Sequence, residues 1–242
     1  MAEKVTIGNC ELWHGDCREV LPLLPKCDLI LTDPPYGIDI GSMGMGKGKK
    51  VAAFESFEWD AEPPPAWLFG LLREKGEDLI VWGGNYFSLG PSGCWLSWDK
   101  MQEFSGADFE LAYTTLRGPS KTFRLSRVQA YGAVERVHPT QKPLSLMEWC
   151  IGKVPDAQTV SDPFMGSGTT GVACVNLGRK FVGIERERKY FDIACRRIEQ
   201  AYAQPRLFED AKVGAGETAV QGDMLLPANC VLCSDVSAWG KP

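Results

Sequence analysis

The hydrophobic pattern of the chain predicts short buried strands separated by helices. Apolar runs of strand length lie at 29–32, 78–82, 94–98, 109–115 and 180–184. Predicted helices lie at 66–75, 142–154 and 188–203, and the last two carry apolar residues at amphipathic spacing. Strands that alternate with helices favour an α/β fold. We therefore expect a mostly parallel sheet with helices on both faces.

The first of these strands ends in the tetrapeptide Asp33-Pro34-Pro35-Tyr36. Neither proline can donate to a sheet ladder, and Pro34 biases Asp33 toward an extended conformation, so the strand must stop here. Ligands of open α/β sheets bind just beyond the carboxyl ends of the strands. The Asp33 carboxylate, the Pro34 carbonyl and the Tyr36 ring can therefore face one pocket. The motif alone also fits a Pro-Pro turn that leaves a strand, with Tyr36 as half-buried packing.

A second motif follows about 130 residues later, where 159–171 reads TVSDPFMGSGTTG. This is a strand end, a glycine loop and a helix start. Gly166 and Gly168 allow a ligand to approach the backbone closely, and the free amides at a helix start favour a negative group. The strand at 180–184 then leads to Glu185, and an acid about 20 positions after a glycine loop presents its carboxylate to ribose hydroxyls. The unit predicts a nucleoside site.

The same glycines satisfy GxGxxG through Gly166, Gly168 and Gly171, so an oxidoreductase that binds nicotinamide or flavin is an alternative. In that fingerprint the first glycine follows the strand almost at once. Here Asp162 and three further residues intervene, and the carboxylate would repel a pyrophosphate. Asp162 suits a ligand with a cationic amino group instead.

These motifs together resemble a known family, the amino-directed DNA methyltransferases of the β arrangement, in which Asp-Pro-Pro-Tyr precedes the glycine loop. The resemblance covers roughly residues 8–203 and includes Gly15-Asp16, the segment HPTQKP at 138–143, and residues 181–198. It implies a Rossmann-like methyltransferase fold with circularly permuted motif order. It also implies S-adenosylmethionine as the cofactor.

The resemblance further implies which residues hold the cofactor. Asp162 and the glycine loop would take its methionine part, Glu185 the ribose and Asp16 the adenine edge. The stretch 140–142 would lie at the amino-acid end. The full expected set is Asp16, His138, Thr140, Gln141, Lys142, Asp162, Phe164, Gly166, Ser167, Gly168, Thr169, Thr170 and Glu185. Arg186 and Glu187 depart from the hydrophobic residue and acid usual in the family, so the wall of the adenine pocket is left undefined.

The implied reaction is methylation of an exocyclic amino group on a base flipped out of duplex DNA. Such a nitrogen is a poor nucleophile because its lone pair is delocalised into the ring. Asp33 and the Pro34 carbonyl are matched to accept its two N–H bonds, and Tyr36 to stack on the base. The expected catalytic residues are therefore Asp33, Pro34, Pro35 and Tyr36, with no metal. By resemblance, Phe109 and Tyr113 are candidates to enclose the base.

Asp at the first motif position resembles the adenine-directed members, so we expect adenine, with cytosine-N4 methylation as the alternative. An RNA or protein-glutamine methyltransferase would more often carry Asn at this position and its glycine loop upstream. A DNA-binding module without activity is disfavoured by the intact acceptor motif. The sequence leaves three points open: the DNA recognition site, the presence of a cognate restriction endonuclease, and whether the protein is a monomer or a homodimer.

The net charge of −5 does not exclude DNA, because phosphate contacts need only local positive potential. Two basic clusters flank the proposed chemistry in sequence. The residues expected to contact DNA are Lys47, Lys49, Lys50, Arg117, Lys121, Arg124 and Arg127. The first three lie in the segment 37–64, rich in glycine and methionine, which we expect to be a mobile closing loop. Solvated loops are the alternative interpretation of both clusters.

The rest of the chain predicts a cytoplasmic enzyme of a bacterial or phage-infected cell. We expect one methyltransferase domain at 1–204, with a basic DNA-contact segment at 116–137, and a loosely attached tail at 205–242. Nine scattered cysteines fit a reducing compartment, and no apolar stretch is long enough to span a membrane. Cys230 and Cys233 have the spacing of half a zinc site without a second pair, so we expect no metal.

Overall fold

The computed structural model describes residues 2–37, 63–101, 107–131 and 141–204. The chain divides after residue 205, and all described residues belong to the first unit. The described elements are β1 (Glu3–Ile7), β2 (Cys10–His14), α1 (Cys17–Val20), η1 (Leu21–Leu23), β3 (Cys27–Thr32), α2 (Ala66–Lys75), β4 (Gly76–Trp82), η3 (Gly84–Tyr86), β5 (Trp95–Asp99), β6 (Phe109–Thr114), β7 (Lys121–Arg124), α3 (Arg127–Tyr131), α4 (Leu144–Ile151), β8 (Thr159–Asp162), α5 (Thr169–Asn176), β9 (Lys180–Glu185) and α6 (Arg188–Ala203). Among these helices, none has the length and apolar character needed to cross a bilayer.

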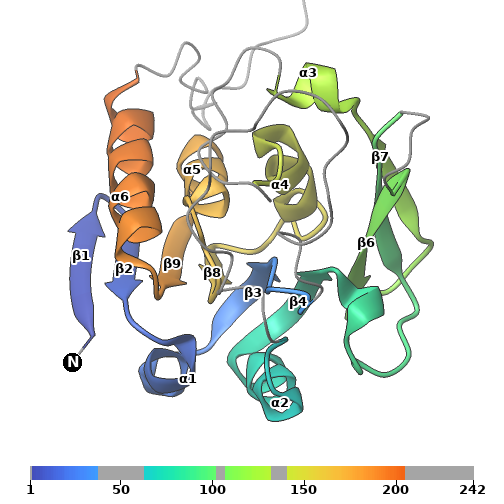
Figure 1. The fold of residues 1–242 in the computed structure, drawn as a ribbon, viewed down its shortest axis with the longest axis horizontal. Coiled ribbons are helices and arrows are strands. Elements are labelled where there is room, and N and C mark those ends of the chain that lie inside the picture. Colours follow the sequence, from blue (N-terminus) through green and yellow to red (C-terminus); the bar gives the residue numbers. More distant parts are fainter. Residues whose placement is uncertain (1, 38–62, 102–106, 132–140, 205–242) are drawn as a thin grey trace, which may run out of the picture. The chain divides into compact units, whose positions relative to one another are not determined.

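Within the described ranges the strands form one nine-stranded sheet, in the order β1-β2-β9-β8-β3-β4-β6-β5-β7. The five strands from β2 to β4 run parallel, whereas β1 and β6 pair antiparallel with their neighbours. Helices α4, α5 and α6 cover one face of the sheet, and α1 and α2 lie on the other (Figure 1). The prediction of an α/β fold with a mostly parallel sheet and helices on both faces is confirmed.

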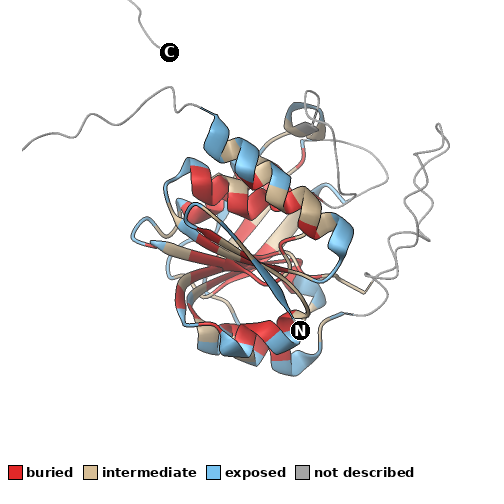
Figure 2. Ribbon diagram, turned by 90° about the vertical axis from the view of Figure 1, so that its left-hand side faces the viewer, coloured by how far each residue is buried: buried red, intermediate tan, exposed pale blue. Residues whose placement is uncertain are grey.

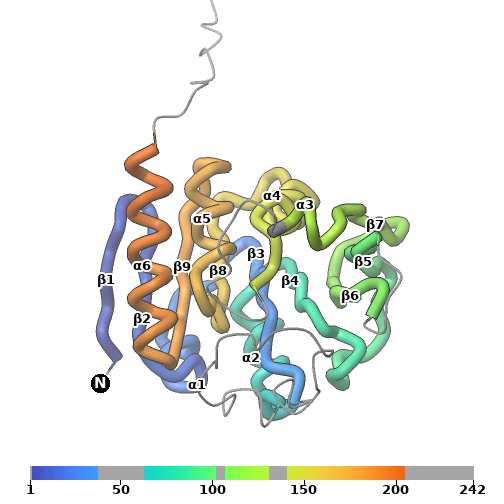
Figure 3. The backbone as a smooth tube through the Cα atoms, turned by 45° about the horizontal axis from the view of Figure 1, so that its top comes forward, coloured from blue at the N-terminus to red at the C-terminus, as the bar shows by residue number. Residues whose placement is uncertain are grey.

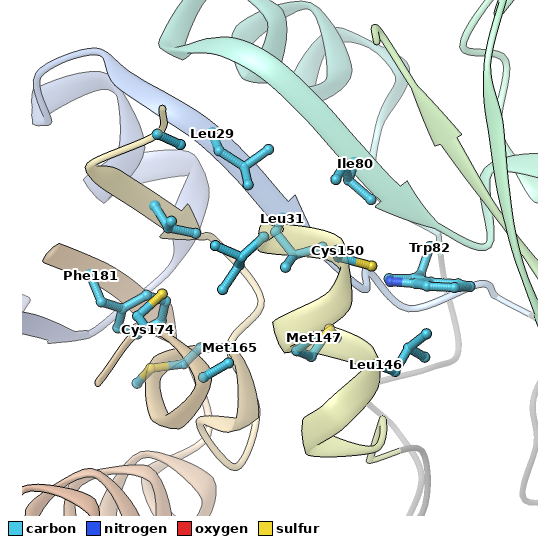
Figure 4. Close-up of a cluster of buried hydrophobic side chains, with 14 of the residues drawn as sticks. Leu29, Leu31, Ile80, Trp82, Leu146, Met147, Cys150, Met165, Cys174 and Phe181 are labelled. Atoms are coloured by element: carbon cyan, nitrogen blue, oxygen red, sulfur yellow. The ribbon is translucent and has the colours of Figure 1, made fainter. Parts of the chain in front are cut away.

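The central strands are buried on both faces because successive side chains point to opposite layers. Leu29, Leu31 and Trp82 belong to the core cluster under α4 and α5, which Figure 4 shows in close-up. Ile30 and Val81 belong to the cluster that packs on α2. Strands of this kind have continuous apolar sequences, which is why 29–32 and 78–82 could be recognised. In Figure 2 the buried residues concentrate in the strands and on the inner sides of the helices.

The two motif-bearing strands, β3 and β8, are parallel neighbours in the middle of the sheet. From β3 the chain continues through α2 to β4 on one side, and from β8 through α5 to β9 on the other (Figure 3). The connections therefore diverge at the carboxyl ends of β3 and β8, and such a switch point is where open α/β sheets bind ligands. The Thr32 hydroxyl donates to Asp162 Oδ1 at 2.7 Å and links the two strand ends.

Most predicted element boundaries agree with the structure to within two residues. Helix α4 is shorter than predicted, because Pro143 is extended and Gly152 follows the last helical residue. Strands β1, β2 and β7 were not predicted. β7 forms part of the segment 116–137 that was expected only to contact DNA.

Six of the seven described cysteines are buried, and all seven are free thiols. Cys10, Cys94, Cys150 and Cys174 lie in the core layer of α4 to α6, and Cys17 and Cys27 in the opposite layer. At these positions the cysteines serve as small apolar core residues. Cys230 and Cys233 lie outside the described residues.

Candidate active site

A pocket of about 250 Å³ opens at the carboxyl ends of β3, β8 and β9. Its walls come from six separate stretches of sequence. The predicted site residues that line it are Asp16, Asp33, Pro35, Gln141, Lys142, Asp162, Phe164, Gly166, Ser167, Thr169, Thr170 and Glu185. The fold therefore assembles most of the predicted set around one cavity.

Asp162 ends β8 and is almost completely buried. Its Oδ1 accepts hydrogen bonds from Thr32 Oγ1 at 2.7 Å and from the Phe164 amide at 3.1 Å, and its Oδ2 accepts one from Thr170 Oγ1 at 2.6 Å. Burial raises the pKa of Asp162 to about 6, against the lowering effect of these hydrogen bonds. The carboxylate is thus oriented from three sides and is ionised near neutral pH.

Glu185 ends β9 and closes the glycine loop from the other side. Its Oε2 accepts from the Gly166 amide at 2.9 Å, and its Oε1 accepts from the Glu187 amide at 2.7 Å. Burial raises the pKa of Glu185 to about 7, although both backbone hydrogen bonds act to lower it. These bonds fix the carboxylate at the pocket wall.

The glycine loop is held from behind by α6. Gly168 has φ +80°, and a Cβ there would come within 2.8 Å of the Ala194 side chain, so this position needs glycine. Arg197 of α6 donates to the Ser167 carbonyl at 2.6 Å and to its hydroxyl at 2.9 Å. Gly168 is absent from the pocket lining, and its role is to shape the loop and begin α5.

Asp16 is the N-cap of α1 and accepts from the Arg18 amide at 2.8 Å. The Arg18 guanidinium also bonds both Asp16 oxygens, and this side-chain pairing is the main reason that the pKa of Asp16 lies below its usual value. Pro64, Leu68 and Tyr190 also line the pocket and supply apolar and aromatic surface. The same pocket is lined by Arg186 and Glu187, where the sequence departs from the family pattern.

The acceptor residue Asp33 lies directly after β3 and takes part in a buried chain of charges. Lys142 Nζ donates to Asp33 Oδ2 at 2.5 Å and lies 3.1 Å from Glu110 Oε2 on β6. Lys100 Nζ, just beyond β5, lies 2.7 Å from Glu110 Oε1. The Tyr36 hydroxyl donates to Asp33 Oδ1 at 2.6 Å. Both Asp33 oxygens therefore accept hydrogen bonds, which is the arrangement of a carboxylate.

The pKa shifts of this chain follow from burial opposed by ion pairing. Burial raises the pKa of Asp33, and the Lys142 ammonium acts to lower it. Burial alone would lower the pKa of Lys142, but the Asp33 and Glu110 carboxylates raise it well above its ordinary value. Burial likewise acts to raise the pKa of Glu110, yet Lys142 and Lys100 hold it at about 2. Lys142 is protonated, and both oxygens of Asp33 accept hydrogen bonds. Asp33 is therefore best described as ionised.

Tyr36 packs in a group of aromatic rings beside Asp33. Its ring stacks on Tyr86 with a centroid distance of 4.8 Å and an interplanar angle of 15°, and Phe87 meets it edge-on at 6.1 Å. Gly83 has φ +69°, and a Cβ there would come within 2.1 Å of the Tyr36 ring, so glycine permits the close approach. The Tyr86 side of the stack is half exposed to solvent.

Several predicted residues lie elsewhere. Pro34 is buried but does not line the pocket. Arg124 and Arg127 lie at the end of β7, the same sheet edge as Asp33, where Arg124 pairs with Asp99 at 3.3 Å. Arg117 and Lys121 lie at the opposite edge, because β7 runs parallel to β5 and antiparallel to β6. His138, Thr140, Lys47, Lys49 and Lys50 lie outside the described residues.

Four contributors were missed from the sequence: Glu110, Lys100, Tyr86 and Arg197. Charged positions in an alternating strand indicate a solvent-exposed face, so the pattern around Glu110 carried no sign of burial. The doublet Gly83-Gly84 after an apolar strand was a usable signal for close packing at Tyr36 and Tyr113.

Known proteins share sequence similarity with this chain. A sequence model described as DNA methylase matches residues 81–196, which contain the glycine loop and Glu185. The Type II methyltransferase M.HinfI of Haemophilus influenzae is 41% identical over 267 positions, covering 86% of this chain and 74% of that protein. The chain belongs to the N6/N4 DNA methylase family.

More distant similarities to this methylase include one sequence relative and two solved structures, and the two structures share its fold. The Type II methyltransferase M2.MboI of Moraxella bovis is 23% identical, over 79% of this chain and 88% of that protein. The solved structure of M1.HpyAVI with SAM covers 78% of this chain and 99% of that one, with 23% identity and a TM-score of 0.52. PvuII DNA methyltransferase, described as cytosine-N4-specific, covers 82% and 92%, with 17% identity and a TM-score of 0.53.

S-adenosylmethionine is the methyl donor of the family, and the pocket of this methylase fits it. The hydrogen-bonded carboxylate of Asp162 would suit the cationic amino end, and that of Glu185 would suit ribose hydroxyls as an acceptor. Leu68 and Tyr190 add apolar and aromatic surface to the pocket lining, which suits an adenine ring. The oxidoreductase alternative is thereby set aside.

We expect Asp162→Asn to weaken binding of S-adenosylmethionine by about tenfold or more, because the neutral side chain loses a charge-assisted hydrogen bond. Asp162 is protonated below a pKa of about 6, so wild-type affinity should fall as the pH drops through that value and the variant should lack this dependence. Calorimetry at several pH values measures both effects.

Asp28→Asn is the matched control, because Asp28 bonds the Gln158 and Thr159 amides at the far end of the same strand pair. It should leave cofactor affinity unchanged. Wild-type affinity and pH dependence in Asp162→Asn would remove Asp162 from the cofactor site.

Proposed function

We propose that this methylase transfers the methyl group of S-adenosylmethionine to the N6 amino group of an adenine within a specific site in duplex DNA. The supporting observation is the position of Asp33. Its carboxylate lines the same pocket as Asp162 and Glu185, and it lies beside the Tyr36 stack. An acceptor for an amino group thus adjoins a nucleoside pocket.

The protein must make a weakly nucleophilic amino nitrogen reactive. S-adenosylmethionine, when bound, supplies an electrophilic methyl group. Asp33 accepts one N–H bond of the target amino group and the Pro34 carbonyl the other, which directs the nitrogen lone pair out of conjugation. As the nitrogen gains a methyl group it must lose one proton, and the buried Asp33, with its raised pKa, is suited to receive that proton.

The target base must leave the duplex to reach Asp33, at a cost of a few kcal/mol. Stacking on aromatic rings offsets this cost, by about 1–3 kcal/mol per base. Tyr36 and Tyr86 form a preassembled stack beside Asp33. The Tyr86 ring is half exposed, so we expect it to be the ring that shifts to admit the base, whereas Tyr36 is held by its hydroxyl.

The choice of adenine over cytosine rests on the residue type at position 33. Asp at this position resembles the adenine-directed members of the family. Both bases present two N–H bonds on an exocyclic amino nitrogen, so the acceptors serve either reaction, and the product decides. Because the proposed substrate is DNA and the sequence relatives are bacterial, we place the enzyme in the cytoplasm of a bacterial cell. We assign the methyltransferase domain to residues 1–204 and the tail to 205–242.

Duplex DNA incubated with the methylase and labelled S-adenosylmethionine should yield labelled N6-methyldeoxyadenosine after digestion to nucleosides and mass analysis. Asp33→Asn should lower the methylation rate by at least about 100-fold with cofactor affinity nearly unchanged, because an oxyanion-type acceptor is lost. Label confined to methylated deoxycytidine would move the assignment to cytosine N4. Full turnover by Asp33→Asn would exclude Asp33 as the acceptor.

Tyr36→Phe should reduce the rate constant at saturating substrates, since the Tyr36 hydroxyl donates to Asp33 and receives a hydrogen bond from Lys142 at 3.2 Å. We expect a loss of about tenfold for Phe and a larger loss for Ala, which also removes the stacking surface. Steady-state kinetics on both variants measure this, and equal rates for Phe and wild type would exclude a role for the hydroxyl.

The two arginines at the carboxyl end of β7, at the same sheet edge as Asp33, are proposed to contact DNA phosphates. The double variant Arg124→Ala with Arg127→Ala should raise the Michaelis constant for DNA. It should also reduce the slope of the logarithm of that constant against the logarithm of salt concentration by about one to two, because one or two fewer counterions are released on binding. The matched control is the pair Arg117→Ala with Lys121→Ala at the opposite sheet edge, which should change neither quantity. An equal effect of the two pairs would assign the contact to the whole segment 116–137, and no effect of either would leave it a solvated loop.

A further inference from the structure

The buried charges around Asp33 extend further than one ion pair requires. Lys142 and Asp33 are mutually neutral, and both side chains are largely hidden from solvent, at 5% and 16% exposure. Yet Lys142 also contacts Glu110, and Glu110 in turn contacts Lys100, whose side chain is 10% exposed. A second carboxylate near Asp33 is repulsive, and desolvating a second ion pair costs stability. Stability alone gives no reason for this arrangement.

The arrangement has a consequence for the hydrogen bonds that reach Asp33. The Lys142 ammonium has three N–H donors, and it contacts Asp33 Oδ2, Glu110 Oε2 and the Tyr36 hydroxyl. Its positive charge is therefore shared between two carboxylates. Lys100 fixes the second carboxylate in place through Glu110 Oε1.

We propose that Glu110, fixed by Lys100, is a positioning residue that shares the Lys142 ammonium with Asp33 and so keeps Asp33 a strong hydrogen-bond acceptor for the target amino group. This rests on the proposed role of Asp33 as the acceptor. Without Glu110, the ammonium pairs with Asp33 alone and withdraws its acceptor strength. Without Lys142, the buried Asp33 takes up a proton and presents a donor.

The groups that face Asp33 act in known directions on its protonation. Lys142 and the Tyr36 hydroxyl lower the pKa of Asp33, and Glu110 raises it. Asp162 on the neighbouring strand end interacts electrostatically with Asp33. Lys100 reaches Asp33 only through Glu110. Removing the Glu110 charge should therefore move the acid limb of the rate profile to lower pH, and removing the Lys142 charge should move it to higher pH.

The test is the pH profile of methyl transfer to DNA at saturating cofactor and DNA, counted as total label so that the target base does not matter. Glu110→Gln should lower the plateau rate by about tenfold or more and shift the acid limb to lower pH. Lys142→Met should shift the limb in the opposite direction. Cofactor affinity and the Michaelis constant for DNA should stay unchanged in Glu110→Gln.

A charge-balanced variant separates positioning from structural support. Glu110→Gln leaves an excess buried cation and lowers stability, whereas Glu110→Gln combined with Lys100→Met restores neutrality. The double variant should recover the melting temperature but keep the reduced rate and shifted limb. Recovery of the wild-type rate and limb in the double variant would overturn the proposal, because a purely structural role predicts that result.

Protonation of the Asp33 carboxyl can also be measured directly. Infrared difference spectra between wild type and Asp33→Asn follow protonation of the Asp33 carboxyl in the cofactor-free protein, and its midpoint should fall in Glu110→Gln. An unmoved midpoint would overturn the proposal. Glu77→Gln, which breaks the exposed pair with Lys26, is the matched control and should leave rate and profile unchanged.

The proposed function and the proposed role of Glu110 can be refuted independently of each other. If wild-type protein transfers no label to DNA, or if Asp33→Asn remains fully active, the acceptor assignment is wrong irrespective of Glu110. If Asp33→Asn is inactive and Glu110→Gln has a wild-type rate and profile, the role of Glu110 alone is wrong.

Discussion

The parallel pairing of β3 with β8 is the constraint on which the rest of the site depends. The register aligns Leu29 with Val160 and Ile30 with Ser161, and the Thr32 hydroxyl then meets the Asp162 carboxylate. A slip of one residue would shift one strand end by about 3.3 Å and turn its apolar side chains to the wrong layer. Two layers of core packing therefore enforce the distance between the acceptor carboxylate and the nucleoside pocket.

Local chemistry explains why so much of this could be predicted from the sequence. Two prolines that end a buried strand, and a glycine loop between a strand and a helix, carry their geometry within a few residues. Asp33, Asp162 and Glu185 were placed correctly at strand ends on this basis, and all three line the pocket. The family resemblance then supplied the cofactor.

Long-range charge pairing could not be predicted in the same way. Glu110 and Lys142 are 32 positions apart in sequence, and an alternating strand with polar residues is normally solvent-exposed on that face. The resemblance gave Lys142 to the cofactor end of the pocket, whereas the structure places its ammonium on Asp33 and Glu110. Gln141 and Lys142 directly precede Pro143 and α4. Both residues line the pocket, and Lys142 in addition donates a hydrogen bond to Asp33.

Each of the two core layers contains its own buried cysteines, whose thiols can be labelled chemically. Burial raises the pKa of the thiols of Cys150 and Cys174 under α4 and α5, and of Cys17 and Cys27 on the opposite face. A thiolate forms at such positions only when the surrounding side chains separate, so alkylation follows the opening of the protein rather than the intrinsic reactivity of sulfur. Alkylation measured separately at each cysteine then shows whether the core layer under α4 and α5 and the layer on the opposite face of the sheet open together or one after the other. No engineered probe is needed.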